Sequence, residues 1–270
     1  MAIDIARFQR SITACIENGE WLLEETEWAV HRASTGVALA MLAQEECAKA
    51  FVLALVRDSI LPWTDDVRRS LAVHECKHLV TMIMEWLLDV NERRFEAIWN
   101  GTSPPAPAAH LPPDVATAMN IYRHELIERI GRRDSERCAS WRGRARKLAD
   151  GERDRRKQAA LYVRIGNDGS LSSAPSESQQ AYDEELVRTK ALVRFAKDAD
   201  RHCIFASREY EMFTELFAGM FRDHGPDGVP VVPAEEYDSG IPGIVFVKRA
   251  ITCADVVNVE DAEPQDSAAA

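Results

Sequence analysis

The sequence has few of the features that mark specialised classes of protein. Its 270 residues include six cysteines at wide, irregular spacings and no Cys-x-x-Cys pair, which is typical of reduced thiols in a cytosolic protein. Aromatic residues are sparse at 7%, while 46% of the residues are hydrophobic and 29% are charged. This composition excludes a disulfide-stapled, collagen-like or wholly disordered chain and indicates one large or two small globular domains.

Long apolar runs and a secretory signal are also lacking. The first ten residues, MAIDIARFQR, carry acidic and basic side chains where a signal peptide needs an apolar core. The most apolar stretch, residues 36–56, is interrupted by Glu45, Glu46 and Lys49, so it cannot form a membrane-spanning helix. We therefore expect a soluble, cytoplasmic protein that makes no contact with membranes.

Positive charge is in deficit, with 33 Lys and Arg against 44 Asp and Glu and a net charge of −11. This balance argues against a protein that coats nucleic acid with its whole surface. Residues 123–164 are the exception, with a net charge near +7 against about −18 for the rest. The segment is either a solvated helix pair or a surface that contacts RNA phosphates. Its predicted RNA contacts are Arg142, Arg144, Arg146, Arg155, Arg156 and Lys157.

Helical periodicity dominates the first hundred residues. Residues 3–27 predict a helix with a break or kink at Asn18-Gly19, and residues 34–56 predict a second helix apolar enough to lie at the centre. A third helix is expected over residues 64–99, with Thr64 as its N-cap.

The later chain is more varied. Five prolines in residues 101–113 predict a loop, after which the helical pattern resumes near residue 114. Residues 160–165 have strand composition and precede the turn sequence Asn167-Asp168-Gly169, which predicts a short hairpin near Tyr162. Residues 181–221 then predict a long helix that packs back on the first ones.

The expected fold class is therefore all-α: a long-helix bundle with a minor β-hairpin and an irregular C-terminal region. We assign residues 1–225 to the helical domain and residues 226–254 to an irregular extension with one strand-like piece. Residues 255–270 form an acidic, alanine-capped tail that we expect to be disordered.

Two polar groups interrupt the apolar helical patterns. Glu45 and Lys49 lie four residues apart on one face of the second predicted helix. In the third, His74 shares a surface with Lys77 and His78, and a nearby lysine favours the neutral imidazole that a proton acceptor needs. Each group is either a structural or solvated charge pair, or part of a site that binds phosphate or moves a proton.

Metal binding is the other chemistry that these residues suggest. His74 and His78 have the helical spacing of a shared metal ion, and Glu75-x-x-His78 is one half of a di-iron carboxylate pattern. A di-iron bundle needs two such motifs, and only one is evident. We therefore predict no metal and no other cofactor.

The order of the polar motifs resembles that of a known family. The motifs are Glu45-Glu46 with Lys49, then His74-x-x-Lys77, then Lys157-x-x-x-Leu161-Tyr162-Val163 with a downstream Pro175. Over about residues 5–225, this order is similar to the AbiV family of bacterial abortive-infection proteins. AbiV is a branch of the HEPN (higher eukaryotes and prokaryotes nucleotide-binding) superfamily.

The resemblance implies a helical bundle, usually dimeric, and for many HEPN members a metal-independent ribonuclease. The HEPN signature is an arginine followed after four to six residues by a histidine, sometimes preceded by Glu-x-x-x-Lys. Glu45 and Lys49 match the preceding element, and Arg68 or Arg69 with His74 fits the signature. Either His74 replaces the usual histidine of a later helix, or the nuclease site has become a binding site.

For a nuclease, the predicted site consists of Glu45, Lys49, Arg69, His74 and Lys77. His74 would remove the ribose 2′-hydroxyl proton, the cations would stabilise the pentavalent anion, and Glu45 would hold Lys49. We expect an antiphage protein that acts on RNA as a homodimer, with a phage-encoded trigger or the translation machinery as further partners. The alternative is a non-catalytic helical protein that arrests growth by binding such a partner.

Overall fold

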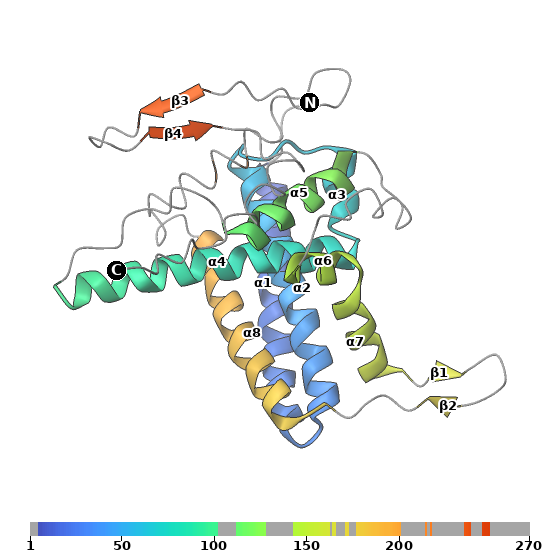
Figure 1. Cartoon of the computed structure of the whole chain (residues 1–270). Coiled ribbons are helices and arrows are strands. Elements are labelled where there is room, and N and C mark those ends of the chain that lie inside the picture. The colour runs from blue at the N-terminus through green and yellow to red at the C-terminus, as the bar shows by residue number, and fades with distance from the viewer. Residues whose placement is uncertain are drawn as a thin grey trace, which may run out of the picture.

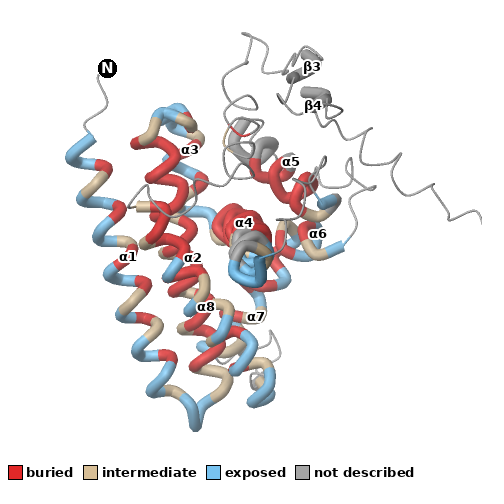
Figure 2. Tube along the Cα trace, turned by 90° about the vertical axis from the view of Figure 1, so that its left-hand side faces the viewer, coloured by how far each residue is buried: buried red, intermediate tan, exposed pale blue. Residues whose placement is uncertain are grey.

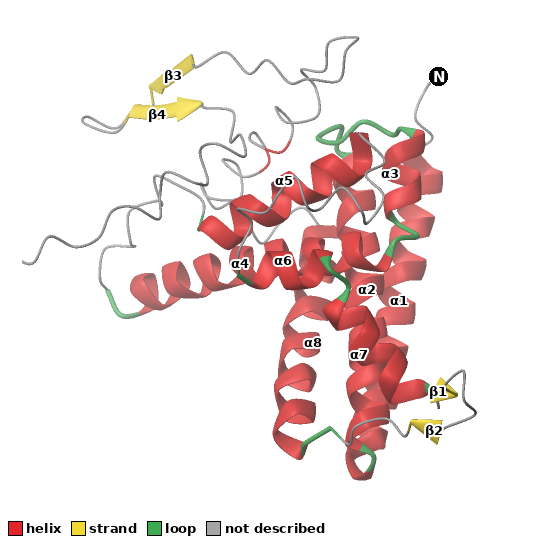
Figure 3. Cartoon of the chain, turned by 45° about the vertical axis from the view of Figure 1, so that its right-hand side comes forward, coloured by secondary structure: helices red, strands yellow, loops and turns green. Residues whose placement is uncertain are grey.

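The computed structural model describes residues 5–101, 112–127, 143–162, 164–165, 171–172 and 177–200, with Thr214, Phe217 and the strand residues 235–238 and 245–248. Most of the predicted Pro-rich loop, Arg142, the helix beyond residue 200 apart from Thr214 and Phe217, and the acidic tail lie outside the described residues. The described part has the predicted all-α class (Figure 3).

Three long helices run side by side and form a bundle: α1 (Ile5–Trp28), α2 (Ala33–Arg57) and α8 (Gln179–Asp200) (Figure 1). A 3-10 turn, η1 (Ala29–His31), joins α1 to α2. Of the predicted break or kink at Asn18-Gly19, the break is wrong, because α1 runs through these residues without interruption. Gly19 is buried where α1 packs on α2, with Cys47 Sγ 3.4 Å from the position that a Cβ would occupy.

The second helix occupies the centre, as predicted. It packs against α1 and α8 on one side and against α4 (His74–Trp99) and α7 (Glu152–Leu161) on the other. Its residues are buried along most of its length, as the red tube in Figure 2 shows. A polar residue that α2 turns toward α4 and α7 is therefore removed from water and needs a partner.

The predicted helix 64–99 is two helices, α3 (Asp65–Ser70) and α4, separated by a turn at residues 71–73. Thr64 caps α3 as predicted, since its Oγ1 accepts a hydrogen bond from Val67 N at 3.2 Å. At the other end, the buried Ser70 Oγ donates to the Val67 carbonyl at 2.8 Å, a bond that competes with helix continuation. The turn makes His74 the first residue of a helix that crosses the bundle (Figures 1 and 3).

A second group of helices packs around α4: α5 (Pro113–Ile127), α6 (Arg144–Ala149) and α7. Gly151 separates α6 from α7 with a left-handed φ of +73°, a conformation that favours glycine. The sharp turn directs α7 back along α2 and α4.

The strands are short and lie apart from the helical core. β1 (Arg164–Ile165) pairs antiparallel with β2 (Leu171–Ser172), and β3 (Glu235–Asp238) pairs antiparallel with β4 (Val245–Lys248). Ala160 and Leu161, which the sequence placed in a strand, belong to α7.

Two further expectations from the sequence concern membrane-spanning helices and disulfides. Within the described residues, no helix is long and apolar enough to cross a membrane. Among the same residues, Cys15, Cys47 and Cys76 form no disulfide.

Candidate functional site

A buried carboxylate, that of Glu45 in the middle of α2, is the centre of a polar cluster between α2, α4 and α7. Only 3% of this side chain is exposed. Its Oε2 accepts hydrogen bonds from His74 Nδ1 at 2.6 Å and Lys77 Nζ at 2.7 Å. Its Oε1 accepts a bond from Lys157 Nζ at 2.5 Å. One carboxylate therefore holds three donors from two other helices.

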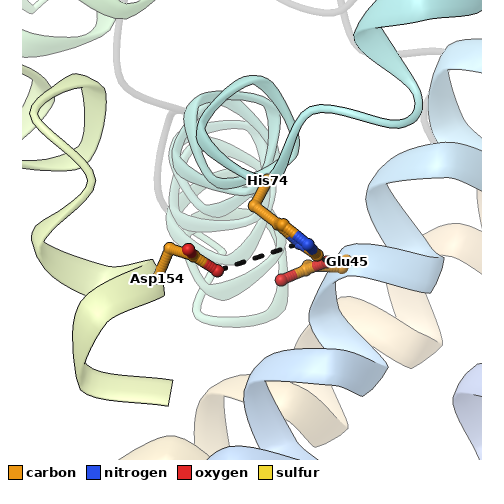
Figure 4. Close-up of side chains that lie close together, drawn as sticks. All are labelled: Glu45, His74 and Asp154. Carbon is orange, nitrogen blue, oxygen red and sulfur yellow. Dashed lines mark hydrogen bonds and ion pairs between the residues drawn. The ribbon is translucent and has the colours of Figure 1, made fainter. Parts of the chain in front are cut away.

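Helical spacing delivers these groups to one place. His74, Lys77 and His78 lie at i, i+3 and i+4 on the first turn of α4, and Asp154 and Lys157 lie at i and i+3 on α7. The side chains of Glu45, His74 and Asp154 point toward one another from three helices in Figure 4. Because α4 begins at His74, this imidazole is 42% exposed, whereas His78 one turn later is buried.

The contacts of His74 determine the state of its ring. A distance of 2.6 Å between Nδ1 and a carboxylate oxygen requires a proton between them, so Nδ1–H donates to Glu45. In the neutral ring the other nitrogen, Nε2, carries the lone pair, and it has no hydrogen-bond partner among the described residues. A buried carboxylate that orients a partly exposed imidazole in this way is the arrangement of a general base.

Lys157 occupies the space in which a metal ion would bind. Glu45, His74 and Asp154 each offer one ligand atom, and these atoms lie within 4.8 Å of one another. However, Lys157 Nζ lies 2.5 Å from Glu45 Oε1, 2.9 Å from His74 Nδ1 and 3.0 Å from Asp154 Oδ1. The ammonium group therefore already supplies the positive charge, and the present residues do not fit a metal ion.

The surroundings of the cluster keep Glu45 charged and His78 neutral. Burial by itself would raise the pKa of Glu45, but hydrogen bonds from Lys157 and Lys77 outweigh it and lower this pKa to about 2. Burial, followed by the positive charge of Arg153, lowers the pKa of His78 from 6.5 to about 3. Glu45 is thus ionised and His78 neutral across the physiological range.

Lys77 is the cation best placed to meet an anion beside His74. Among the described residues its ammonium group pairs only with Glu45, so N–H bonds remain for a ligand. The Lys157 ammonium, by contrast, contacts Glu45, His74 and Asp154. Glu45 and Asp154 balance the two lysines, and an additional anion can be accommodated when His74 gains a proton.

A second buried network anchors α7 beside the cluster. Arg153 donates to Glu185 Oε2 at 2.5 Å and also to the side-chain oxygen of Gln44. The Gln44 amide in turn donates to Glu185 at 2.9 Å and to Thr189 at 2.8 Å. Because Gln44 precedes Glu45 and Arg153 precedes Asp154, these bonds determine the distance between α2 and the site residues of α7.

Two of the site residues predicted from sequence lie elsewhere. The predicted Glu45–Lys49 pair is wrong, because Lys49 Nζ pairs with Glu46 Oε1 at 2.5 Å. The α2 helix turns Glu46 toward α1, where its Cβ is 3.7 Å from the Cβ position of Gly19, whereas Glu45 faces α4 and α7. Position 49 therefore belongs to a different surface.

Arg69 is also absent from the cluster. On α3, Arg69 pairs with Asp66 at 3.3 Å and Arg68 pairs with Asp65 at 3.1 Å. Both arginines are exposed. The turn after α3 separates these side chains from the first turn of α4, so neither arginine forms an ion pair with the Glu45 cluster among the described contacts.

The arginines predicted to contact RNA differ in their exposure and in their ion pairs. Arg144 pairs with Glu85 at 2.6 Å, and Arg156 pairs with Glu177 at 2.7 Å and with Glu185 at 3.4 Å. Arg146 and Arg155 are exposed, near the side chain and the carbonyl of Asp150 respectively. Arg142 lies outside the described residues.

Sequence reasoning missed Asp154, and it placed Lys157 on an RNA surface rather than in the site. Lys157 is in fact 5% exposed at the cluster centre. The third family motif, Lys157-x-x-x-Leu161-Tyr162, could have indicated both residues. It contains Lys157, and Asp154 lies one helical turn earlier. His78 was considered only as a metal ligand.

Comparison with known proteins identifies the family. No curated protein matches the chain, and no solved structure matches it. A family model, HEPN_AbiV, described as AbiV, matches residues 7–194. That range contains the four residues of the carboxylate-centred contacts, Glu45, His74, Lys77 and Lys157. The chain therefore belongs to the AbiV family of HEPN-type abortive-infection proteins.

Proposed function

We propose that this AbiV-family protein is a metal-independent RNA endonuclease that arrests growth during phage infection. The observation that carries the proposal is the His74–Glu45 pair: Nδ1 is bound to a buried carboxylate at 2.6 Å while the ring remains 42% exposed. An imidazole oriented through one nitrogen and open at the other is suited to take a proton from a substrate.

The chemistry follows from the position of these groups. His74 Nε2 accepts the proton of a ribose 2′-hydroxyl, and the oxygen attacks the adjacent phosphorus. Lys77 stabilises the pentavalent anion. The bond from phosphorus to the 5′-oxygen then breaks, and this oxygen takes a proton from solvent. The products are a 2′,3′-cyclic phosphate and a 5′-hydroxyl end.

RNA binding and dimerisation belong to the same proposal. The exposed Arg146 and Arg155 give the basic segment phosphate contacts outside the cluster, so affinity for RNA should fall steeply with salt. The chain forms a homodimer, as the family resemblance implies. Light scattering at micromolar concentration should give about twice the 30.3 kDa chain mass, and a particle of 30.3 kDa would contradict the dimer.

The test of the nuclease is cleavage of total RNA by the purified protein in EDTA. Wild type should produce fragments with cyclic phosphate ends, and His74→Ala should lower the rate by about 10²–10⁴-fold. Lys77→Met should also lose activity. Lys49→Ala is the matched control, since this lysine lies on α2 but pairs with Glu46 outside the cluster. An intact RNA pool, or a fully active His74→Ala protein, would overturn the proposal.

One observation favours the non-catalytic alternative. Lys77 and Lys157 are only 9% and 5% exposed, as in a buried strut that holds three helices together. In that case His74→Ala would retain growth arrest, and disruption of the cluster would abolish function only together with folding. Activity and thermal unfolding of the same His74→Ala preparation separate these outcomes.

A further inference from the structure

His78 is a buried imidazole with no hydrogen-bond partner. Its side chain has no exposed surface, and neither Nδ1 nor Nε2 is bound to any described residue. Buried polar groups are nearly always paired, because an unpaired one loses its bonds to water without replacement. An apolar side chain at this position would avoid the loss, so the histidine needs a reason other than packing.

The nearest acceptor of His78 is the carboxylate that holds the candidate base. Nε2 lies 3.5 Å from Glu45 Oε1, too far for a hydrogen bond and a fraction of an ångström from forming one. This same oxygen is held at 2.5 Å by the Lys157 ammonium. Lys157 therefore occupies the place at Oε1 that His78 could fill.

The contact between Lys157 and His74 makes that occupancy depend on the charge of His74. The ammonium nitrogen is 2.9 Å from His74 Nδ1, which is close but tolerable while the ring is neutral. When Nε2 gains a proton, two positive groups face each other at this distance in a largely buried cluster. Lys157 retains the ion pair with Asp154 Oδ1 at 3.0 Å, so it can withdraw toward α7 without losing its counter-charge.

We propose that His78 is a positioning residue, which donates from Nε2–H to Glu45 Oε1 when protonation of His74 displaces Lys157. The inference rests on the proposed function, because it gives the base step a way to keep Glu45 fixed while the charge beside it changes. The carboxylate is then held by His78 on one oxygen and by His74 and Lys77 on the other. The base remains oriented through the step in which it becomes positive.

The displacement can be tested without RNA, by observing the rings of His74 and His78 together as the pH is lowered. The groups facing His78 are Glu45 on α2 and Arg153, Asp154 and Lys157 on α7. Glu45, with a pKa of about 2, and His78, with a pKa of about 3, do not change state above about pH 5. A change in the His78 signal above about pH 5 therefore does not come from titration of His78 itself.

The measurement is ¹⁵N and ¹H NMR of the histidine rings in the full chain, assigned with His74→Asn and His78→Gln. As His74 gains its proton, the His78 Nε2–H signal should move downfield and its exchange with water should slow. In Lys157→Met, whose apolar side chain leaves Oε1 free, His78 should give the bonded signal at every pH. Protonation of His74 with no change at His78, or an unbonded His78 in folded Lys157→Met, would overturn the inference.

Kinetics of RNA cleavage give a second, independent readout. His78→Leu should fold at least as stably as wild type, because it removes an unpaired polar group, yet kcat should fall with KM unchanged. His78→Gln, which retains a donor, should recover part of the loss. Unchanged kcat in His78→Leu would contradict the positioning role. If the protein cleaves no RNA but shows the NMR response, the proposed nuclease activity is wrong, whereas the displacement of Lys157 is supported.

Discussion

At the scale of single residues, the carboxylate of Glu45 determines what its neighbours do. It holds His74 Nδ1–H through Oε2 and, together with Asp154, balances the buried charges of Lys77 and Lys157. Lys49, four residues away on the same helix, pairs with Glu46 and has none of these partners. Lys49 is therefore expected to contribute much less to stability and function than the lysines that contact Glu45.

Glu45→Gln should cost about 3–5 kcal/mol of unfolding free energy, because Lys77 would remain buried without a counter-charge and Lys157 would retain only Asp154. Urea denaturation followed by circular dichroism measures this loss. Lys49→Ala serves as control and should change stability by no more than about 0.5 kcal/mol. Equal midpoints and slopes for the two variants would contradict the central role of Glu45.

Lys157→Ala should create a metal site that the native chain does not have. Removing the ammonium frees Glu45 Oε1 and Asp154 Oδ1, and His74 Nδ1 becomes a third ligand when the metal displaces its proton to Nε2, which gives a ligand set of the types that bind Zn²⁺ or Co²⁺. Titration with Co²⁺ should give visible d–d absorption in the variant and none in wild type. The double variant Lys157→Ala/Asp154→Asn should lose it. A cobalt spectrum in wild type would show that the lysine does not block the site.

At the scale of elements, the site depends on how closely helices approach and where they begin. The turn at residues 71–73 makes His74 the first residue of α4, so its side chain stays partly exposed to solvent. Gly36 lets α8 approach α2, because a Cβ there would lie 2.4 Å from the Tyr182 ring. The α2–α8 contact in turn supports the Arg153–Glu185–Gln44 network.

Replacing each of two helix-interior glycines by alanine should have opposite effects. Gly36→Ala should destabilise the protein by about 1–3 kcal/mol, because the Tyr182 ring must move. Gly19→Ala meets only ordinary contacts at 3.4 Å and should be neutral or gain up to about 1 kcal/mol from helix propensity. Thermal unfolding of the two variants checks the pair. A Gly36→Ala protein as stable as wild type would contradict the close packing of α8 on α2.

At the scale of the whole molecule, the buried cluster makes stability depend on pH. The pKa of His78 is about 3 in the fold and about 6.5 when exposed, so the unfolded chain binds this proton first as pH falls. Stability is thus complete above about pH 6.5 and is lost progressively toward pH 3. The depressed pKa of Glu45 adds a loss below about pH 4.5 for the same reason.

Urea unfolding at several pH values should therefore show a decline that begins near neutrality. His78→Leu should flatten the part of this decline between about pH 6.5 and 4.5, because the variant has no imidazole to titrate. His31→Leu, which changes an exposed histidine, should leave the decline unaltered. Parallel curves for wild type and His78→Leu would show that the buried imidazole is not the source.

The sequence by itself determined the helical class, the central position of α2, the Thr64 cap and the order of motifs that marks the family. These follow from local periodicity and capping, which depend on near neighbours in the chain. It also indicated Glu45, His74 and Lys77, because charges in an apolar helical pattern need partners.

The tertiary structure decided which partners those are. Periodicity gives Glu45 and Lys49 a shared helix face, but only the packing of α4 and α7 shows that Glu45 faces Lys77 and Lys157 while Lys49 faces Glu46. The break before His74 and the arrival of Lys157 from 112 residues away likewise depend on long-range contacts. A carboxylate pairs with whichever donors packing brings within about 3 Å, and sequence spacing limits that choice only within a single helix.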